Sequence, residues 1–125
     1  MKIPGRFLEE ARLTCTPVVE CVALLFGRRD TVIRWTWVRN VAGSPLAFRI
    51  DPEEMYRAIT EAEESDLELL AIFHSHPGPP VPSAVDMRYM ELWPVVWVIS
   101  DVYSWRTAAW RAGGGDLREV PLEFV

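Results

Sequence analysis

The chain contains two histidines, and both lie in one short segment, His74-Ser75-His76-Pro77. Side chains separated by one residue on an extended chain point to the same side. Asp86 follows after a proline-rich stretch and adds a carboxylate. Two imidazoles and one carboxylate are a common ligand set for catalytic zinc, with the fourth position left to water. We therefore predict that His74, His76 and Asp86 bind one zinc ion per chain and lower the pKa of a bound water to about 7.

A second carboxylate, Glu20, is a candidate for the general base. It interrupts the almost continuously apolar run VVECVALLF, residues 18–26. Burial of an ionised carboxylate without a partner costs free energy, so this position needs an explanation. A place beside a metal site supplies one, because Glu20 could then take a proton from the attacking water and carry it to the leaving amine.

Each of these features also has a structural interpretation. Histidines in an HxH pattern are often ordinary surface residues. Ser83-x-x-Asp86 matches a helix capping box, although capping does not exclude a metal-binding role for the same carboxylate. Glu20 could lie on the solvent face of an edge strand. The metal site is favoured because all the required groups occur together.

The arrangement of these residues resembles a known family. The pattern Glu20…His74-Ser75-His76-Pro77…Pro82-Ser83-x-x-Asp86 is similar to that of the JAMM (MPN-plus) metalloproteases, which include deubiquitinases and small prokaryotic relatives. The run ECVALLFG, residues 20–27, resembles the family's E-C-x-G-L-L-x-G strand. Residues 40–59 and 70–74 also resemble the prokaryotic members, so the resemblance covers about residues 18–100.

The resemblance implies a role for each site residue. His74, His76 and Asp86 would bind Zn²⁺, Glu20 would act as the acid/base, and Ser83 would donate a hydrogen bond to the developing oxyanion. It also implies the cytidine-deaminase-like MPN fold. The expected activity is that of a zinc-dependent isopeptidase or peptidase acting at the Gly-Gly tail of ubiquitin-like or sulfur-carrier proteins. Such a tail could bind as an added strand at a sheet edge.

Two features depart from the family pattern. Six residues, 77–82, separate His76 from Ser83, where the family has seven. Ala23 replaces the glycine that follows the cysteine in the family strand. The Ser83-x-x-Asp86 spacing is kept, so Asp86 is expected to reach the metal. The short, proline-dense loop affects the placement of Ser83 and the shape of the substrate channel.

Two other functions remain open at this stage. One is a non-catalytic scaffold of the MPN-minus type, although those domains lack the ligand set that this chain keeps. The other is a RadC-like relative associated with DNA repair, which shares the H-x-H-P…P-S-x-x-D pattern. The formal net charge of -5 argues against that alternative, because contacts with nucleic-acid phosphates need a basic face. The sequence has neither an HExxH motif nor the PCxxC motif of deaminases.

Length and composition favour one domain, residues 1–125. The chain has 125 residues, of which 50% are hydrophobic, enough for one compact core. No apolar run reaches the roughly 18 residues of a membrane span, and no secretory h-region is recognised, so we predict a cytoplasmic protein. A monomer or homodimer without nucleic-acid or membrane partners is expected. Cys15 and Cys21 are too few for a disulfide framework and are predicted to be small buried residues.

The hydrophobic periodicity predicts an α+β fold with a central mixed sheet flanked by a few helices. Asp51, Pro52 and Glu54 form a clear helix start, with an N-cap, a proline at the first helical position and an acidic residue beyond. The expected helices are 7–13, 51–65 and one opening at Ser83, and the expected strands are 18–26, 31–38, 48–50, 67–73, 95–100, 105–111 and 120–125.

Overall fold

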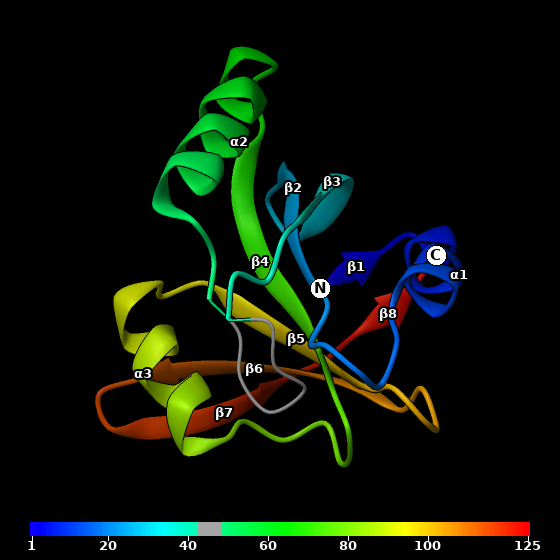
Figure 1. Cartoon of the computed structure of the whole chain (residues 1–125). Coiled ribbons are helices and arrows are strands. Elements are labelled where there is room, and N and C mark those ends of the chain that lie inside the picture. Colours follow the sequence, from blue (N-terminus) through cyan, green and yellow to red (C-terminus); the bar gives the residue numbers. More distant parts are fainter. Residues whose placement is uncertain (43–48) are drawn as a thin grey trace.

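A computed structural model describes residues 1–42 and 49–125 of the chain. One eight-stranded mixed sheet runs through these residues in the order β7-β6-β5-β4-β2-β3-β1-β8. Three helices pack around it in the described part of the chain (Figure 1). The elements are β1 (Lys2–Ile3), α1 (Gly5–Thr14), β2 (Val22–Arg28), β3 (Thr31–Val38), α2 (Pro52–Glu64), β4 (Glu68–His76), α3 (Ala84–Leu92), β5 (Val96–Asp101), β6 (Thr107–Gly113), β7 (Asp116–Val120) and β8 (Glu123–Phe124). The predicted α+β fold with a mixed sheet is confirmed.

The helix start at Asp51 forms as predicted. The Asp51 side chain accepts a hydrogen bond from the Glu53 N–H, and Pro52 occupies the first turn of α2. The helix is capped at its other end by Ser65. Ser83 likewise caps α3. Local capping chemistry therefore determines where both helices begin.

Several predicted strands differ from the observed ones. The strand expected over 18–26 begins only at Val22, and Val18 is exposed. Pro17 has no backbone N–H to donate to a ladder, which favours a turn at this point. Of the strand expected over 48–50, residue 48 lies outside the described residues, and 49–50 are not in a strand. The strand expected over 120–125 is divided between β7 and β8, and β1 was not predicted.

The two faces of the sheet have separate apolar cores. One contains Ala71 and Phe73 of β4 together with Phe7 and Ala11 of α1. The other contains Ile72 of β4 together with side chains of β2, α2 and α3. Successive side chains of a strand alternate between faces, so His74 and His76 share the face of Ile72. The site therefore opens on the side of α2 and α3, away from α1.

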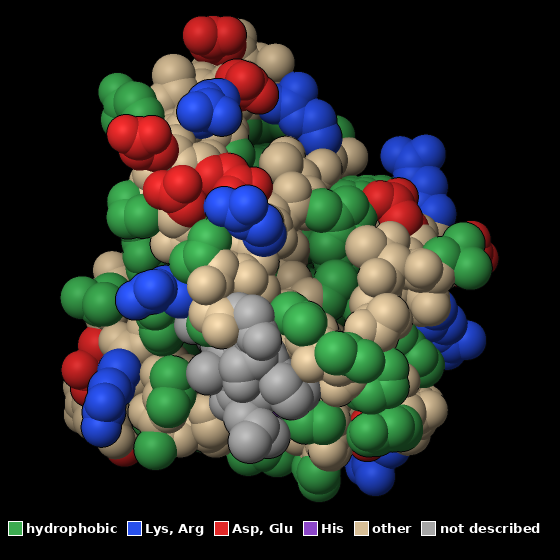
Figure 2. Space-filling model, viewed as in Figure 1, with side chains coloured by type: hydrophobic (Ala, Val, Ile, Leu, Met, Phe, Trp, Pro, Cys, Tyr) green, Lys and Arg blue, Asp and Glu red, His purple; other side chains and the backbone are tan. Residues whose placement is uncertain are grey.

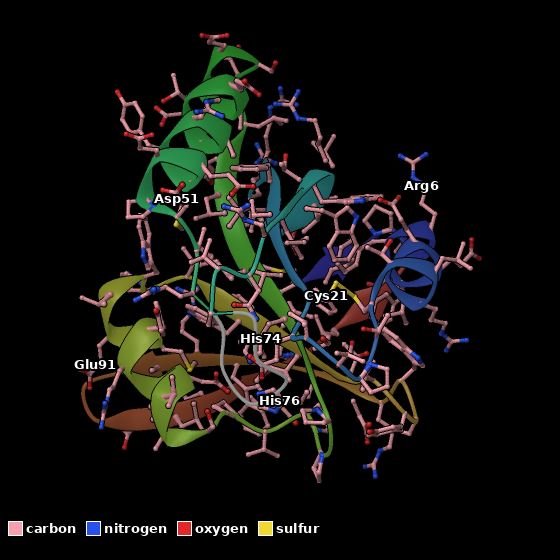
Figure 3. The ribbon with its side chains drawn as sticks, in the orientation of Figure 1. Arg6, Cys21, Asp51, His74, His76 and Glu91 are labelled. Carbon is pink, nitrogen blue, oxygen red and sulfur yellow. A yellow bond between two sulfur atoms is a disulfide. The ribbon has the colours of Figure 1, made fainter. Side chains whose placement is uncertain are left out.

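Cys15 is buried, as predicted, and Cys21 is partly buried, but the two form a disulfide that the sequence analysis did not predict. Cys15 follows the last residue of α1, and Cys21 immediately precedes β2. Their Cα atoms are 5.3 Å apart, a separation typical of disulfides. The bond is visible beside the Cys21 label in Figure 3. It ties the end of α1 to the segment that carries Glu20.

No helix within residues 1–42 and 49–125 is long and apolar enough to cross a membrane.

Candidate metal centre

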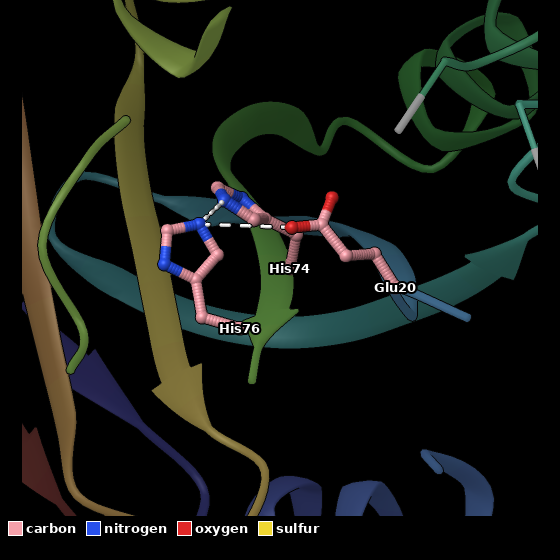
Figure 4. A group of neighbouring side chains, drawn as sticks. All are labelled: Glu20, His74 and His76. Carbon is pink, nitrogen blue, oxygen red and sulfur yellow. Dashed lines mark hydrogen bonds and ion pairs between the residues drawn. The ribbon is translucent and has the colours of Figure 1, made fainter. Parts of the chain in front are cut away.

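The pairing of β2 with β4 brings Glu20 to the histidines. The strands are antiparallel, with Val22 opposite His74. One residue further along, the Ser75 N–H donates to the Cys21 carbonyl at 3.0 Å, and the Cys21 N–H donates to Ser75 Oγ at 2.9 Å. This continuation places Glu20 opposite His76. Residues opposite each other in an antiparallel pair share a face, so Glu20, His74 and His76 converge (Figure 4).

Glu20 is buried, as predicted, but it does not lie in the middle of a strand. It precedes β2 and is only 4% exposed. Its Oε1 lies 3.7 Å from His76 Nε2. Its Oε2 is buried and has no hydrogen-bond partner within residues 1–42 and 49–125. A buried carboxylate oxygen that faces a cluster of ligating groups is suited to accept a proton there.

Asp86 reaches the same cluster from the first turn of α3. Its Oδ2 lies 2.9 Å from His76 Nε2 and 3.2 Å from His74 Nε2. The same oxygen accepts the Ser83 N–H at 2.8 Å, and the Asp86 N–H donates to Ser83 Oγ at 3.1 Å. The capping box and the contact with the histidines therefore coexist.

The short proline loop is fastened at two points, which helps to bring Asp86 into reach. The Trp110 Nε1–H of β6 donates to the Pro80 carbonyl at 2.8 Å. His76 Nδ1 lies 3.4 Å from the Pro79 carbonyl. An Nδ1–H donated to a carbonyl leaves Nε2 as the nitrogen that can bind a metal ion, which is the usual orientation of a ligating histidine.

The three closest groups fit a metal ion. His74 Nε2 and His76 Nε2 are 3.0 Å apart, and each lies within 3.2 Å of Asp86 Oδ2. Tetrahedral zinc with bonds of about 2.0–2.1 Å would hold its ligand atoms about 3.3 Å apart, which is close to these separations. Two nitrogen acceptors facing each other repel unless a proton or a cation lies between them. The donor set and its spacing are thus those of a divalent cation site.

A second combination, Glu20 with both histidines, also brings one ligand atom per residue within 4.8 Å. The distances to the histidine nitrogens distinguish the two carboxylates. Asp86 Oδ2 touches both histidine nitrogens, whereas Glu20 Oε1 lies 3.7 Å from the nearer one. The distances therefore favour Asp86 over Glu20 as the third ligand.

Burial and neighbouring charges shift the pKa of each candidate ligand. Burial lowers the pKa of His74 below its ordinary value, so the ring is neutral, the form that binds metals. Burial alone would raise the pKa of Asp86, but hydrogen bonds from His74 and His76 outweigh it and hold that pKa well below the ordinary range. Burial alone would lower the pKa of His76, but its hydrogen bond to Asp86 and the nearby carboxylates raise it.

The pKa of Glu20 is shifted upward, opposite to that of the other carboxylate, Asp86. Burial raises its pKa to about 8, against a smaller lowering by His76 and with a further contribution from Asp86. A pKa near neutrality suits a group that must both accept and release a proton during turnover.

Sequence reasoning missed two residues that hold Glu20 in place, Ser75 and Asn40. Ser75 receives the Cys21 N–H, and Asn40 Nδ2 donates to the Glu20 carbonyl at 3.1 Å. The sequence offered one signal for each: Ser75 is a polar residue between the two histidines, and Asn40 lies just after a predicted strand. For Ser83, the described contacts are those of the helix cap, and its oxyanion role stays a prediction.

A model of the family described as prokaryotic homologs of the JAB domain (Prok-JAB) matches residues 5–113. The chain belongs to this family. The resemblance to the small prokaryotic JAMM proteins is thereby confirmed.

Three proteins with named activities are clearly similar in sequence to the chain. It is 41% identical over 99 residues to a desampylase from Pyrococcus furiosus, a match covering 78% of this chain and 71% of the relative. It is 42% identical over 101 residues to a probable TtuB-protein conjugate cleaving protease from Thermus thermophilus, covering 78% and 67%. A desampylase from Haloferax volcanii is 33% identical over 110 residues, covering 85% and 78%.

Solved structures share the fold. A solution structure of a protein from Desulfitobacterium hafniense matches with a TM-score of 0.85 at 25% identity, over 99% of this chain and 92% of that one. The crystal structure of a JAB1/MPN domain protein from Archaeoglobus fulgidus matches with a TM-score of 0.63 at 22% identity, over 100% and 99%. The expected MPN fold is therefore confirmed.

Proposed function

We propose that this chain is a zinc-dependent isopeptidase or peptidase that cleaves at the Gly-Gly tail of ubiquitin-like or sulfur-carrier proteins. The observation that carries the proposal is the convergence of His74, His76 and Asp86 within 3.2 Å, with Glu20 beside them. A non-catalytic scaffold has no need of such a cluster, because closely spaced polar groups cost stability when His74, Asp86 and Glu20 are buried and His76 is partly buried.

Each side chain has a distinct task in the proposed reaction. His74 Nε2, His76 Nε2 and Asp86 Oδ2 would hold zinc, which would supply Lewis-acid activation of the attacking water and of the scissile carbonyl. Glu20 accepts the proton of that water on its carboxylate and delivers it to the leaving amine nitrogen. Ser83 Oγ already accepts the Asp86 N–H, so its own hydroxyl hydrogen is available to the oxyanion.

The names of the relatives and the chemistry of an amide-cleaving site support a proposal for the substrate class. The similar proteins are named as desampylases and as a protease of TtuB-protein conjugates. We propose that the partner is likewise a small β-grasp protein with an extended Gly-Gly tail, joined to a lysine side chain or to an amino acid. Two glycines allow the tail to pass close to the backbone around the ligands.

The remaining assignments are part of the same proposal. Residues 1–125 form one metalloprotease domain that acts in the cytoplasm as a monomer or homodimer, without nucleic-acid or membrane partners. Acidic and basic side chains are interspersed over α2 in the space-filling view, so this face of α2 is not the basic surface that a nucleic-acid partner needs (Figure 2).

Activity on defined substrates tests the function. Purified protein is incubated with a Gly-Gly-tailed β-grasp protein, either fused to a C-terminal peptide or linked to a lysine of a carrier. We expect cleavage after the second glycine, its loss on chelation and its recovery on addition of zinc. A substrate whose glycines are replaced by alanines serves as the control. A zinc-loaded protein that cleaves none of these substrates but binds them tightly would instead support the scaffold.

A further inference from the structure

Asn40 makes hydrogen bonds in two directions from one side-chain amide. Its Nδ2 donates to the backbone carbonyl of Glu20 at 3.1 Å. Its Oδ1 accepts the N–H groups of Ala42 and Arg49, each at 3.0 Å. The orientation of the amide follows from these partners, because a flipped side chain would point its NH₂ group at two N–H donors.

The Glu20 backbone needs such support because the regular ladder ends before it. The paired residues of β2 and β4 begin at Val22, and the Cys21 N–H is satisfied by a side chain, Ser75 Oγ. Behind Glu20, the chain turns back toward α1 and is tied there by the Cys15–Cys21 disulfide. The Asn40 amide is thus the contact that fixes the Glu20 carbonyl from the β3 side.

We propose that Asn40 is a positioning residue for the reaction: it fixes the backbone of Glu20 so that the buried carboxylate faces His76. This inference rests on the proposed function only in assuming that Glu20 transfers the proton. Side chains that act in a reaction must be held closely, because a displacement of about 1 Å can reduce the rate by roughly 10²-fold.

The donor and acceptor contacts of the Asn40 amide can be tested separately by substitution. Asn40→Asp keeps an Oδ1 acceptor for the Ala42 and Arg49 N–H groups but removes the donor to the Glu20 carbonyl. Asn40→Ala removes both the donor and the acceptor contacts and introduces no charge. The loss of the donor is common to the two variants. An effect shared by both therefore belongs to the Glu20 contact, whereas an effect of the aspartate alone belongs to its charge.

Kinetics is the first test. We expect both variants to keep their zinc and to show a kcat lowered by roughly 10–100-fold, with KM changed far less, since the substrate is still bound but the base is displaced. Wild-type kcat in both variants would overturn the proposal, provided that Glu20→Gln is inactive in the same assay. A loss of kcat in Asn40→Asp alone would also overturn it, since charge would then be the cause.

Hydrogen exchange supplies a readout that does not depend on activity. We expect the peptide covering residues 16–22 to exchange faster in both variants than in the wild type. The Ala42 and Arg49 amides should exchange faster only in Asn40→Ala, because Asn40→Asp keeps the two acceptor bonds. Unchanged exchange over 16–22 in both variants would overturn the positioning role. If neither the wild type nor any variant cleaves a substrate, the proposed function fails, while this exchange measurement still decides whether Asn40 holds Glu20.

Discussion

Ser83 and Asp86 exchange two hydrogen bonds across the first turn of α3, and the Asp86 oxygen that takes part lies 2.9 Å from His76 Nε2. A single carboxylate oxygen thus belongs both to a helix cap and to the candidate ligand set. The cap fixes the rotamer of Asp86 before any ion binds. A ligand held in this way loses little conformational entropy on metal binding.

The first prediction concerns this dual carboxylate. Asp86→Asn keeps an oxygen that can accept the Ser83 N–H, so the helix should form, but a neutral amide is a poor zinc ligand. We expect about one zinc per wild-type chain and an affinity lowered by roughly 10–100-fold or more in the variant. Metal analysis after equilibrium dialysis measures this. Asp116→Asn, a change of an exposed aspartate, is the control and should retain its zinc. Equal zinc content in all three proteins would show that Asp86 only caps the helix.

Metal removal should lower the stability of the fold. Zinc that binds the folded chain but not the unfolded chain raises the free energy of unfolding. The increase is about 2.7 kcal/mol at a free zinc concentration 100 times the dissociation constant. We therefore expect the thermal midpoint of the wild type to fall on chelation and to recover with zinc. Differential scanning calorimetry measures both changes. The thermal midpoint of Asp86→Asn should change little with either treatment. A wild-type midpoint that is unchanged by the chelator would argue against a bound metal.

The third prediction concerns Glu20 as the proposed general base. Glu20→Gln keeps the size and buried position of the side chain but cannot accept a proton. We expect a folded, zinc-loaded protein whose kcat is lowered by about 10²–10⁴-fold. Parallel zinc analysis and steady-state kinetics on the same preparation are required. Zinc-loaded Glu20→Gln that cleaves at nearly the wild-type rate would make Glu20 a structural residue.

The parts of the site that sequence reasoning predicted are those that depend on local patterns. His74 and His76 share a face because side chains alternate along any strand, and Ser83 with Asp86 follows the spacing of a capping box. Both patterns span fewer residues than a single helix or strand. The helix start at Asp51 was predictable for the same reason.

The parts that were missed depend on contacts between distant segments. Glu20 was expected within a strand, but its environment is created by pairing with β4 and by Asn40, which no local pattern reveals. The Cys15–Cys21 bond requires the chain to turn back from α1 to β2. The pairing of β1 with β8, with Lys2 opposite Glu123, joins the two ends of the chain, and neither short segment predicts it alone.

The disulfide should stabilise the fold measurably. It closes a short loop, for which the loss of chain entropy in the unfolded state amounts to about 2 kcal/mol. We expect Cys15→Ser to lower the free energy of unfolding in urea by that amount. A thiol reductant should lower the wild-type value similarly and leave the variant unchanged. A wild type that is insensitive to reductant, with free thiols found by labelling, would show that the bond does not form in solution.

Ser83 allows the sharpest test, because helix capping and oxyanion binding predict different results for it. As a cap alone, Ser83→Ala should cost about 1 kcal/mol of stability and leave the rate per folded molecule unchanged. As an oxyanion donor, the same change should lower kcat by about 10²–10³-fold with little effect on zinc content. Ser83→Asp separates the roles further, since aspartate still caps a helix but places a negative charge where the oxyanion forms. We expect Ser83→Asp to be folded, zinc-loaded and nearly inactive in the cleavage assay. A fully active Ser83→Asp protein would mean that the hydroxyl serves only the helix.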